Sequence, residues 1–270
     1  MVEYLAGNRI IGTDSERTPQ IIEDFSIDNS YDTQTGTAYT VDYTTNNRIE
    51  FDFTKDDNIH EVSFDLETMG GFTINSSSWV AEWTFKVIDS FTQATTSGAH
   101  ATMGFSSVAN GGNSQTGDHV GLEIRNVVSA GSLMNLVGGV NATIDTARTD
   151  GSVDVGTNGF ERFIRLIKNG NTCTLEIYTD SNRSTTPTTH TITLAHTVGL
   201  KYFRVLNIDL ANGGSNADGN MSVDDFKFYN GVTSIPSTTV ENLIDGSIFY
   251  AKDTNKEYVL NNNTWTEVWF

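Results

Sequence analysis

Short segments in which apolar and polar residues alternate recur through the 270-residue chain, and they constrain its fold more than any other feature. Alternation places the apolar side chains on one face of an extended strand, whereas a helix needs them at every third or fourth position. Strands are therefore predicted at 48–53, 61–66, 79–87, 101–105, 119–126, 132–140, 160–168, 172–178, 189–195, 202–210 and 221–229. Turn residues separate them, as at Asn169-Gly170, where Asn-Gly readily adopts the positive φ of a tight hairpin. The pattern predicts an all-β chain.

The prolines suggest how these strands are organised. Pro19 and Pro236 enclose one uninterrupted strand-rich block, and a sandwich of a little over 200 residues can fold around a single core. We expect an N-terminal arm at 1–24, a two-sheet antiparallel β-sandwich of jelly-roll type at 25–231, and a linker with a C-terminal β-meander attachment segment at 232–270. The predicted core contains Trp79, Trp83, Phe85, Leu166, Leu175 and Ile177.

The charge and the apolar pattern of the chain exclude several classes of partner. The net charge is −18, from 34 acidic and 16 basic residues. Phosphate contacts need clustered Lys and Arg, so neither nucleic acid nor an anionic membrane is an expected partner. No apolar run is long enough for membrane insertion, and 1–11 lacks the basic and apolar regions of a classical signal peptide.

The single cysteine, Cys173, alternates with Leu175 and Ile177 and is predicted to be a small buried hydrophobe.

Three stretches of the central block carry a resemblance to a known superfamily. The hairpin at 160–180, the pair at 201–208 and 219–231, and the Trp-rich strand at 79–87 resemble the concanavalin A-like lectin and glucanase superfamily. The likeness is strongest to its laminin-G-like sandwiches, which occur in phage, archaeal-virus and cell-surface proteins. This resemblance spans roughly 25–231 and implies a jelly-roll fold; it implies much less about activity, because one fold hosts many activities.

The two ends resemble parts of viral proteins. Residues 2–12 are similar to the opening of sandwich proteins encoded by environmental viruses and marine archaea, and 245–267 is similar to short C-terminal modules of phage structural proteins. The tail is predicted to be a three-strand meander with turns at 253–256 and 261–263, too small to hold its own core. The resemblance implies a location on a virion or at an extracellular surface.

Apolar side chains at both ends predict assembly contacts. Each end is too short to bury these side chains alone, so a partner surface is expected in a homo-oligomer or against other virion proteins. The predicted contact residues are Tyr4, Leu5, Ile10, Ile11, Phe249, Tyr250, Tyr258 and Trp265.

No catalytic residues are expected. The superfamily's laminarinase-like hydrolases carry Glu-x-Asp-x-x-Glu on one strand, and Glu50-Phe51-Asp52-Phe53-Thr54-Lys55 begins this motif but ends it with a lysine. A retaining hydrolase needs both carboxylates, so a cation at Lys55 argues against this activity. The chain is therefore predicted not to be an enzyme, and the hydrolase remains the less favoured alternative.

The sequence indicates no cofactor other than calcium. His119-Val120-Gly121-Leu122-Glu123 resembles a lectin metal strand, but the preceding strand lacks carboxylates at Met103 and Phe105, so His119 is predicted to be an ordinary strand-end histidine. Oxygen donors gather instead at Asp218, Asn220 and Asp224, which form the candidate calcium site.

A mixed polar strand supplies the candidate glycan-binding residues. Tyr202, Arg204 and Asn207 are expected to be exposed there. The favoured function is a virion structural or surface-adhesion protein that displays a lectin-like sandwich and binds host surface glycans. A free-standing carbohydrate-binding module of cellular origin is the alternative, and glycan affinity with exposed aromatics on a concave face would favour it.

Overall fold

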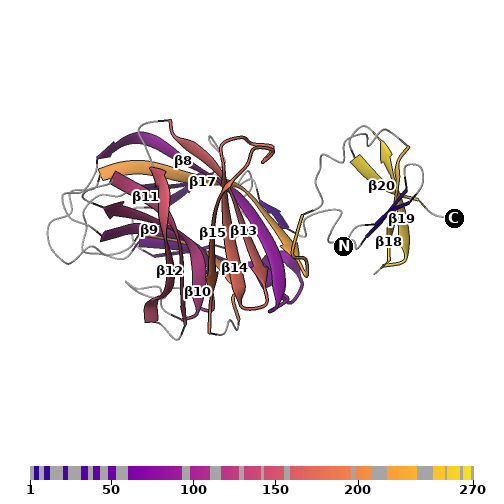
Figure 1. Cartoon of the computed structure of the whole chain (residues 1–270), viewed down its shortest axis with the longest axis horizontal. Coiled ribbons are helices and arrows are strands. Elements are labelled where there is room, and N and C mark those ends of the chain that lie inside the picture. The colour runs from indigo at the N-terminus through magenta and orange to yellow at the C-terminus, as the bar shows by residue number, and fades with distance from the viewer. Residues whose placement is uncertain are drawn as a thin grey trace.

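The computed structural model describes residues 3–5, 9–12, 21–23, 32–35, 39–42, 48–52, 60–92, 98–109, 117–127, 131–140, 143–154, 159–195, 199–207, 218–235, 246–252, 254–261 and 264–268. Nearly all of the regular structure in these ranges is β-strand, and their one helix is the short α2 (Leu66–Gly70). The all-β prediction is confirmed. Figure 1 shows two large curved sheets stacked against each other and a small third sheet beside them.

The first large sheet has eight strands, and its pairings are antiparallel. Its order is β15 (Thr188–Thr193), β14 (Thr172–Tyr178), β13 (Glu161–Asn169), β8 (Ser78–Thr92), β17 (Asp218–Asn230), β6 (Arg48–Asp52) and β5 (Tyr39–Asp42), with β3 (Ile21–Glu23) also pairing with β17. β3 belongs to the sandwich although it falls within the predicted arm.

The second large sheet has seven antiparallel strands. Its order is β12 (Thr143–Asp154), β11 (Gly131–Val140), β10 (His119–Val127), β9 (Gly98–Ser106), β16 (Tyr202–Asn207), β7 (His60–Asp65) and β4 (Asp32–Thr35). β12 has no counterpart among the predicted strands, because its sequence, rich in Thr and Asp, lacks apolar alternation.

The hydrophobic core lies between these two sheets. All six core residues predicted from alternation are buried, with 0% exposure for Trp79 and Trp83 and 3% for Ile177. The two tryptophans of β8 meet phenylalanines of the opposite sheet: the ring centroids of Trp79 and Phe105 lie 4.2 Å apart, and those of Trp83 and Phe203 lie 5.5 Å apart. Aromatic contacts of this kind add to the free energy of burial and join the sheets into one sandwich.

Two local details differ from the sequence prediction. The β13–β14 hairpin pairs Asn169 with Thr172, so the loop residues are Gly170 and Asn171; of these, only Gly170 has positive φ, at 60°. This places glycine first in the loop, as in type II′ hairpin turns. Leu66 opens α2 instead of ending β7, because Asp65 caps the helix by accepting the N–H groups of Glu67 and Thr68.

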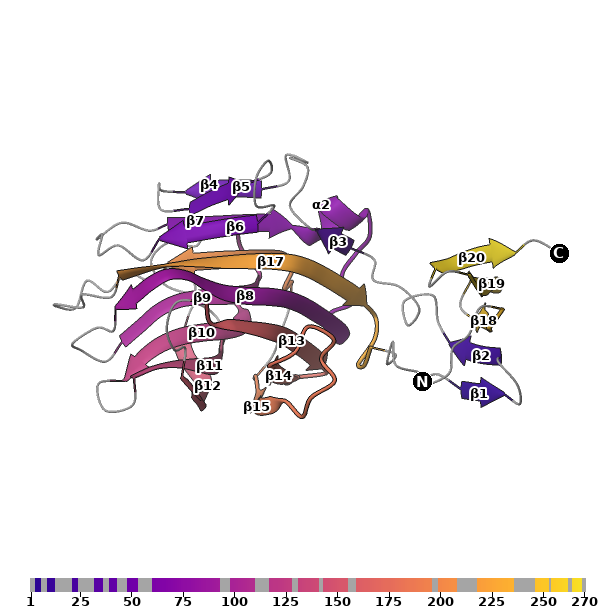
Figure 2. The same ribbon diagram turned by 90° about the horizontal axis from the view of Figure 1, so that it is seen from above.

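The third sheet combines strands from both ends of the chain. Its order is β1 (Glu3–Leu5), β2 (Arg9–Gly12), β18 (Ile248–Ala251), β19 (Lys256–Asn261) and β20 (Thr264–Val268). The predicted C-terminal meander is confirmed as β18–β20, and β2 pairs with β18 in parallel. In Figure 2 this five-stranded sheet stands beside the sandwich.

The predicted assembly residues lie in this third sheet. Phe249 and Tyr258 are buried, and Tyr250 is half-buried. Tyr4, Leu5, Ile10, Ile11 and Trp265 are described in their backbone only, which places Ile10 opposite Phe249 and Ile11 opposite Tyr250. The two ends thus pair with each other, and a role in assembly stays a prediction. No helix in the described ranges is long and apolar enough to cross a membrane.

Candidate functional site

The seven-stranded sheet buries polar side chains on the face that points away from the core. Its apolar residues, such as Met103, Leu122 and Val205, face the other sheet, so the residues between them face outward. We call this outward surface the polar face. Its buried polar members are Glu61, Ser63, Thr102, Ser106, His119, Glu123, Asn135 and Arg204.

Strand register arranges the polar face in three cross-strand rows. The first row joins Glu61, Leu206, Thr102, Glu123 and Asn135. The second joins Ser63, Arg204, Gly104, Gly121 and Val137, and the third joins Asp65, Tyr202, Ser106, His119 and Gly139. Residues from β7, β16, β9, β10 and β11 therefore meet on one surface, although they are far apart in sequence.

Arg204 lies at the centre and is held by two neighbouring strands. Its Nε and Nη2 donate to the Oε1 and Oε2 atoms of Glu61 at 2.5 and 2.8 Å, and its Nη1 donates to Ser106 Oγ at 3.1 Å. The Arg204 side chain is 5% exposed and that of Glu61 is fully buried. A two-point pair of this kind fixes the guanidinium plane, so Arg204 presents its other N–H groups in a set direction.

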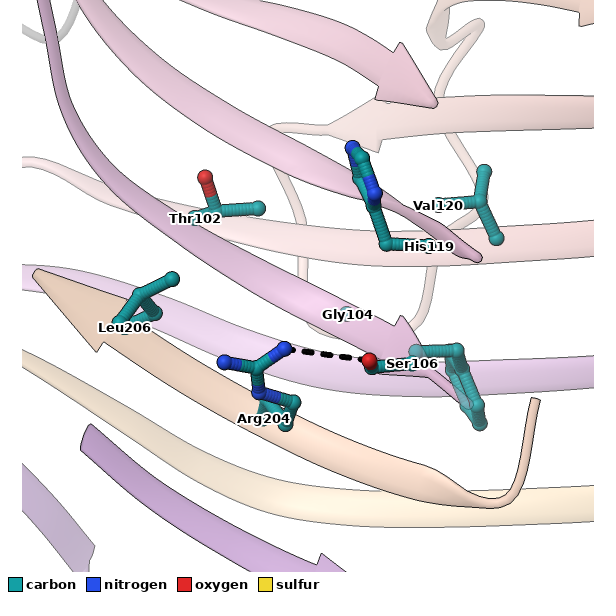
Figure 3. Close-up of a pocket in the computed structure, with 8 residues that line it drawn as sticks. Thr102, Gly104, Ser106, His119, Val120, Arg204 and Leu206 are labelled. Carbon is teal, nitrogen blue, oxygen red and sulfur yellow. Dashed lines mark hydrogen bonds between the residues drawn. The ribbon is translucent and has the colours of Figure 1, made fainter. Parts of the chain in front are cut away.

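Two glycines make a hollow beside Arg204. Gly104 and Gly121 lie directly opposite each other, and a Cβ at either position would stand 2.4 Å from a backbone oxygen of the neighbouring strand. Neither position can carry a side chain, so the surface is recessed there. Thr102, Ser106, His119 and Leu206 line the hollow together with Arg204 (Figure 3). Its volume is about 20 Å³, enough for one water-sized group.

The remaining polar groups are also oriented by contacts. Asn135 Nδ2 donates to Glu123 Oε2 at 3.2 Å, and His119 Nδ1 lies 3.3 Å from the carbonyl oxygen of Gly117. Because a carbonyl oxygen only accepts, Nδ1 is the donor in this contact. The imidazole is therefore held in a defined orientation at the edge of the hollow.

The polar face has more hydrogen-bond donors than the hydrogen bonds among the described residues use. A guanidinium has five N–H groups, and Arg204 uses three of them among the described residues. Opposite Arg204, the buried hydroxyl of Ser63 has no hydrogen-bond partner among those residues. The face can therefore donate further hydrogen bonds to a ligand rich in oxygen.

The three predicted glycan-binding residues differ in their exposure and in how much of each the structure describes. Arg204 was expected to be exposed, and this is wrong: it is buried and paired with Glu61. Tyr202 is half-buried on the same face, where the ammonium of Lys201 lies 4.7 Å from its ring centroid. For Asn207 the structure describes only the backbone, which pairs with His60 and Ala101.

Sequence reasoning missed the other members of the polar face, including His119, which it treated as an ordinary strand-end residue. The signal available was the polar half of each alternating strand, for instance Glu61 and Ser63 between Val62 and Phe64. Alternation places these residues on the second face but does not say whether that face is buried.

The candidate calcium residues do not converge on one point. Asn220 and Asp224 both lie on β17, four positions apart, which corresponds to about 13 Å along a strand. Asp224 Oδ1 accepts the backbone N–H of Asp225 at 2.6 Å, and the side chain of Asp218 lies outside the described part. No group of three acidic, His or Cys residues in the described ranges could hold a metal. Calcium binding stays a prediction that these positions alone do not support.

A second charged cluster covers the outer face of the eight-stranded sheet. Glu82 pairs with Arg165 at 2.8 Å and with Arg183 at 3.3 Å, and Tyr178 donates to Glu176 at 2.5 Å. Burial, followed by the hydrogen bond to Glu176, raises the pKa of Tyr178 to about 12. The opposite charges of Glu82, Arg165 and Arg183 neutralise one another.

Comparison with known proteins assigns the chain to no family. No family model matches the chain, and no curated protein matches it. Similar solved structures include a peanut lectin (15% identity, TM-score 0.47, covering 76% of this chain and 95% of the lectin). Another is the CBM2 module of the Dit protein of Lactobacillus casei BL23 phage J-1 (10%, 0.46, 80% and 97%). A third is an alginate lyase from Klebsiella pneumoniae (10%, 0.45, 75% and 87%).

These structures share the jelly-roll, lectin-like sandwich found here. They also correct one prediction: the expectation that the chain is not an enzyme is wrong as an exclusion, because three of the similar structures are alginate lyases. At 8% to 10% identity the likeness concerns the fold and assigns no activity to this chain. Glu50 of the hydrolase-like motif lies on β6 of the other sheet, where it accepts a hydrogen bond from Arg48 at 2.8 Å.

Proposed function

We propose that the chain binds carbohydrate on the polar face of the seven-stranded sheet. The observation that carries this proposal is Arg204, a buried guanidinium fixed by Glu61 and Ser106 that keeps two N–H groups without a partner among the described residues. Burying an ion pair costs more free energy than burying apolar side chains of similar volume. A polar face that is maintained under burial is therefore better explained by a ligand than by stability.

The chemistry of the face suits sugars. Hydroxyl groups both donate and accept hydrogen bonds, and the face offers N–H donors from Arg204 and the hydroxyl of Ser63, which can donate or accept. Hydrogen bonds to charged groups contribute about 1.5–3 kcal/mol, more than neutral ones. The hollow beside Gly104 has room for one hydroxyl, so a sugar would place a single hydroxyl there, next to Arg204.

Glycan-array screening followed by calorimetry tests this proposal. Thr102→Val and His119→Gln alter the lining of the hollow with little change in volume. Each should weaken binding of the best array ligand about two- to tenfold, as expected for the loss of one neutral hydrogen bond. Thr174→Val is the matched control, because Thr174 lies on β14 of the other sheet and hydrogen-bonds Thr191. Equal affinity in all variants, or no array ligand at all, would refute the proposal.

We further propose that the sandwich serves adhesion, displayed on a virion or at an extracellular surface. Support comes from the resemblance of the two ends to viral proteins and from the separate sheet that those ends build. Mass spectrometry of purified virus particles is the direct test. Recovery of the chain only from cell culture medium would favour a free-standing carbohydrate-binding module.

A further inference from the structure

Lys168 occupies a core-facing position at one end of the sandwich. It lies opposite Trp79 on β8 and opposite Cys173 on β14, both of which are fully buried. Residues directly opposite across antiparallel strands share a face, so the lysine side chain enters the layer between the two sheets. Its exposure is 1%, and lysine is seldom buried without a charged partner.

The Lys168 ammonium has little compensation for this burial. Nζ donates to the carbonyl oxygen of Gly170 at 2.5 Å, and no carboxylate pairs with it among the described residues. Burial lowers the pKa of Lys168, while the Cys173 thiol acts in the opposite direction. A buried ammonium held by one carbonyl oxygen retains two N–H groups for a further acceptor.

A cavity adjoins this lysine. It has about 100 Å³ of space and lies between the start of β8, the end of β13, α2 and the segment before β16. Trp79 lines it, and the fully buried indole Nε1–H of Trp79 has no hydrogen-bond partner among the described residues. A buried N–H without an acceptor costs about 1–3 kcal/mol. One residue whose N–H donor has no partner among the described residues, Trp79, and one whose ammonium uses a single donor there, Lys168, therefore line the same cavity.

The other charged residues of the cavity are already engaged. Lys201 Nζ forms an ion pair with Asp65 Oδ2 at 3.0 Å, and Glu67 Oε1 accepts the backbone N–H of Ile74 at 3.0 Å. The lining residues thus comprise two lysines and one glutamate, and the glutamate is turned to the backbone. Because Asp65 neutralises Lys201 and Glu67 adds a further negative charge, the cation that would attract an anion here is Lys168, which has no carboxylate partner among the described residues.

We propose that this cavity binds a carboxylate group, carried by a small organic acid or by an acidic sugar. Its two oxygens would accept from Trp79 Nε1, which lacks a partner among the described residues, and from an N–H group of Lys168 Nζ that the bond to Gly170 does not use. A water occupies about 30 Å³ in the liquid, so the space holds about three waters or a group of that size. The site lies at the end of the sandwich and is independent of the carbohydrate proposal for the polar face.

Indole N–H resonances provide the experiment. Trp79 and Trp83 both have buried Nε1–H groups without a partner among the described residues, but only Trp79 lines the cavity. ¹H–¹⁵N spectra, assigned through Trp79→Phe and Trp83→Phe, are recorded during titration with sodium acetate at an ionic strength held constant with sodium chloride. We expect a saturable shift of the Trp79 signal while the Trp83 signal stays still.

Two lysine variants and two further ligands complete the test. Lys168→Met should abolish the acetate response, and Lys86→Met, which removes an exposed lysine on β8, should leave it unchanged. Thermal unfolding checks that both variants fold. Acetate should raise the Tm of the wild type and of Lys86→Met, but not that of Lys168→Met. Glucuronate acting like acetate while glucose has no effect assigns the carboxylate to an acidic sugar; a response to acetate alone assigns it to a small acid. No saturable Trp79 shift, or an equal shift in Lys168→Met, overturns the proposal.

Discussion

The Glu61–Arg204 pair allows a quantitative test of the burial of the polar face. Arg204→Met removes the cation and leaves a carboxylate that is fully buried without its two charge-assisted hydrogen bonds. Removing one member of a buried pair typically costs 3–5 kcal/mol, because the remaining charge is uncompensated. We expect the free energy of unfolding of Arg204→Met to fall by about this amount.

The double variant Glu61→Leu/Arg204→Met should behave differently. Replacing both charges by apolar groups of similar size is often neutral or stabilising by about 1–4 kcal/mol. Ser106 Oγ also loses its Arg204 donor, which costs about 1 kcal/mol. The double variant should therefore unfold within about 1 kcal/mol of the wild type, and the double-mutant cycle should give a coupling energy of about 3 kcal/mol or more.

Urea denaturation followed by tryptophan fluorescence measures all members of the cycle. The control is Lys86→Met, since Lys86 and Glu161 are about 40% exposed and 3.9 Å apart, and an exposed pair contributes less than about 1 kcal/mol. If Arg204→Met costs no more than Lys86→Met, or if the double variant loses the sum of the single losses, the pair is not buried as the structure places it.

Four further outcomes are expected. Trp83→Ala should lower the free energy of unfolding by about 3–5 kcal/mol in urea denaturation, because it empties a fully buried site. Asp65→Ala should cost about 1 kcal/mol at pH 7. Burial opposes ionised Asp65, but Lys201 and two backbone N–H groups outweigh it and hold its pKa below the usual value. The wild-type advantage is therefore present above about pH 4 and lost as pH falls through the lowered pKa, which urea titrations between pH 2 and 7 measure. Cys173 should resist a thiol reagent at pH 8 until urea is added, since burial raises its pKa to about 12. Deleting residues 1–19 and 237–270 should leave a folded sandwich that has lost any oligomeric state; a full-length chain that is monomeric in light scattering would refute the assembly prediction.

The sequence predicted the core better than the polar surface, and the reason is physical. Alternation along one strand is sufficient to place Trp79, Trp83 and Ile177 inside, because the sandwich buries whichever face is apolar. Burial of the second face depends on what covers it, which no local pattern records. Arg204 was therefore expected to be exposed, although it is 5% exposed.

The position of strands relative to one another was equally hidden. Arg204 meets Gly104 and Ser63 because β16 pairs with both β9 and β7, and these partners lie about 100 and 140 positions earlier in the chain. The same holds for the ends, where β2 pairs with β18. Each end was expected to be too short to bury its own apolar residues, but the sequence did not show that the other end provides a partner strand.

The polar face and the Lys168 cavity share one unusual property: both bury charged side chains at positions where a β-sandwich normally has solvated polar or buried apolar residues. An antiparallel sheet commonly has one face on the core and one face in water, so polar residues on its second face normally stay solvated. Here Glu61, Glu123 and Arg204 are buried on that face, and Lys168 enters the core side of the other sheet. Apolar residues at these positions would cost less free energy to bury. Each site also keeps N–H donors unused among the described residues, so the two binding proposals rest on the same physical reason: a ligand that accepted those hydrogen bonds would offset part of the free energy that burial costs.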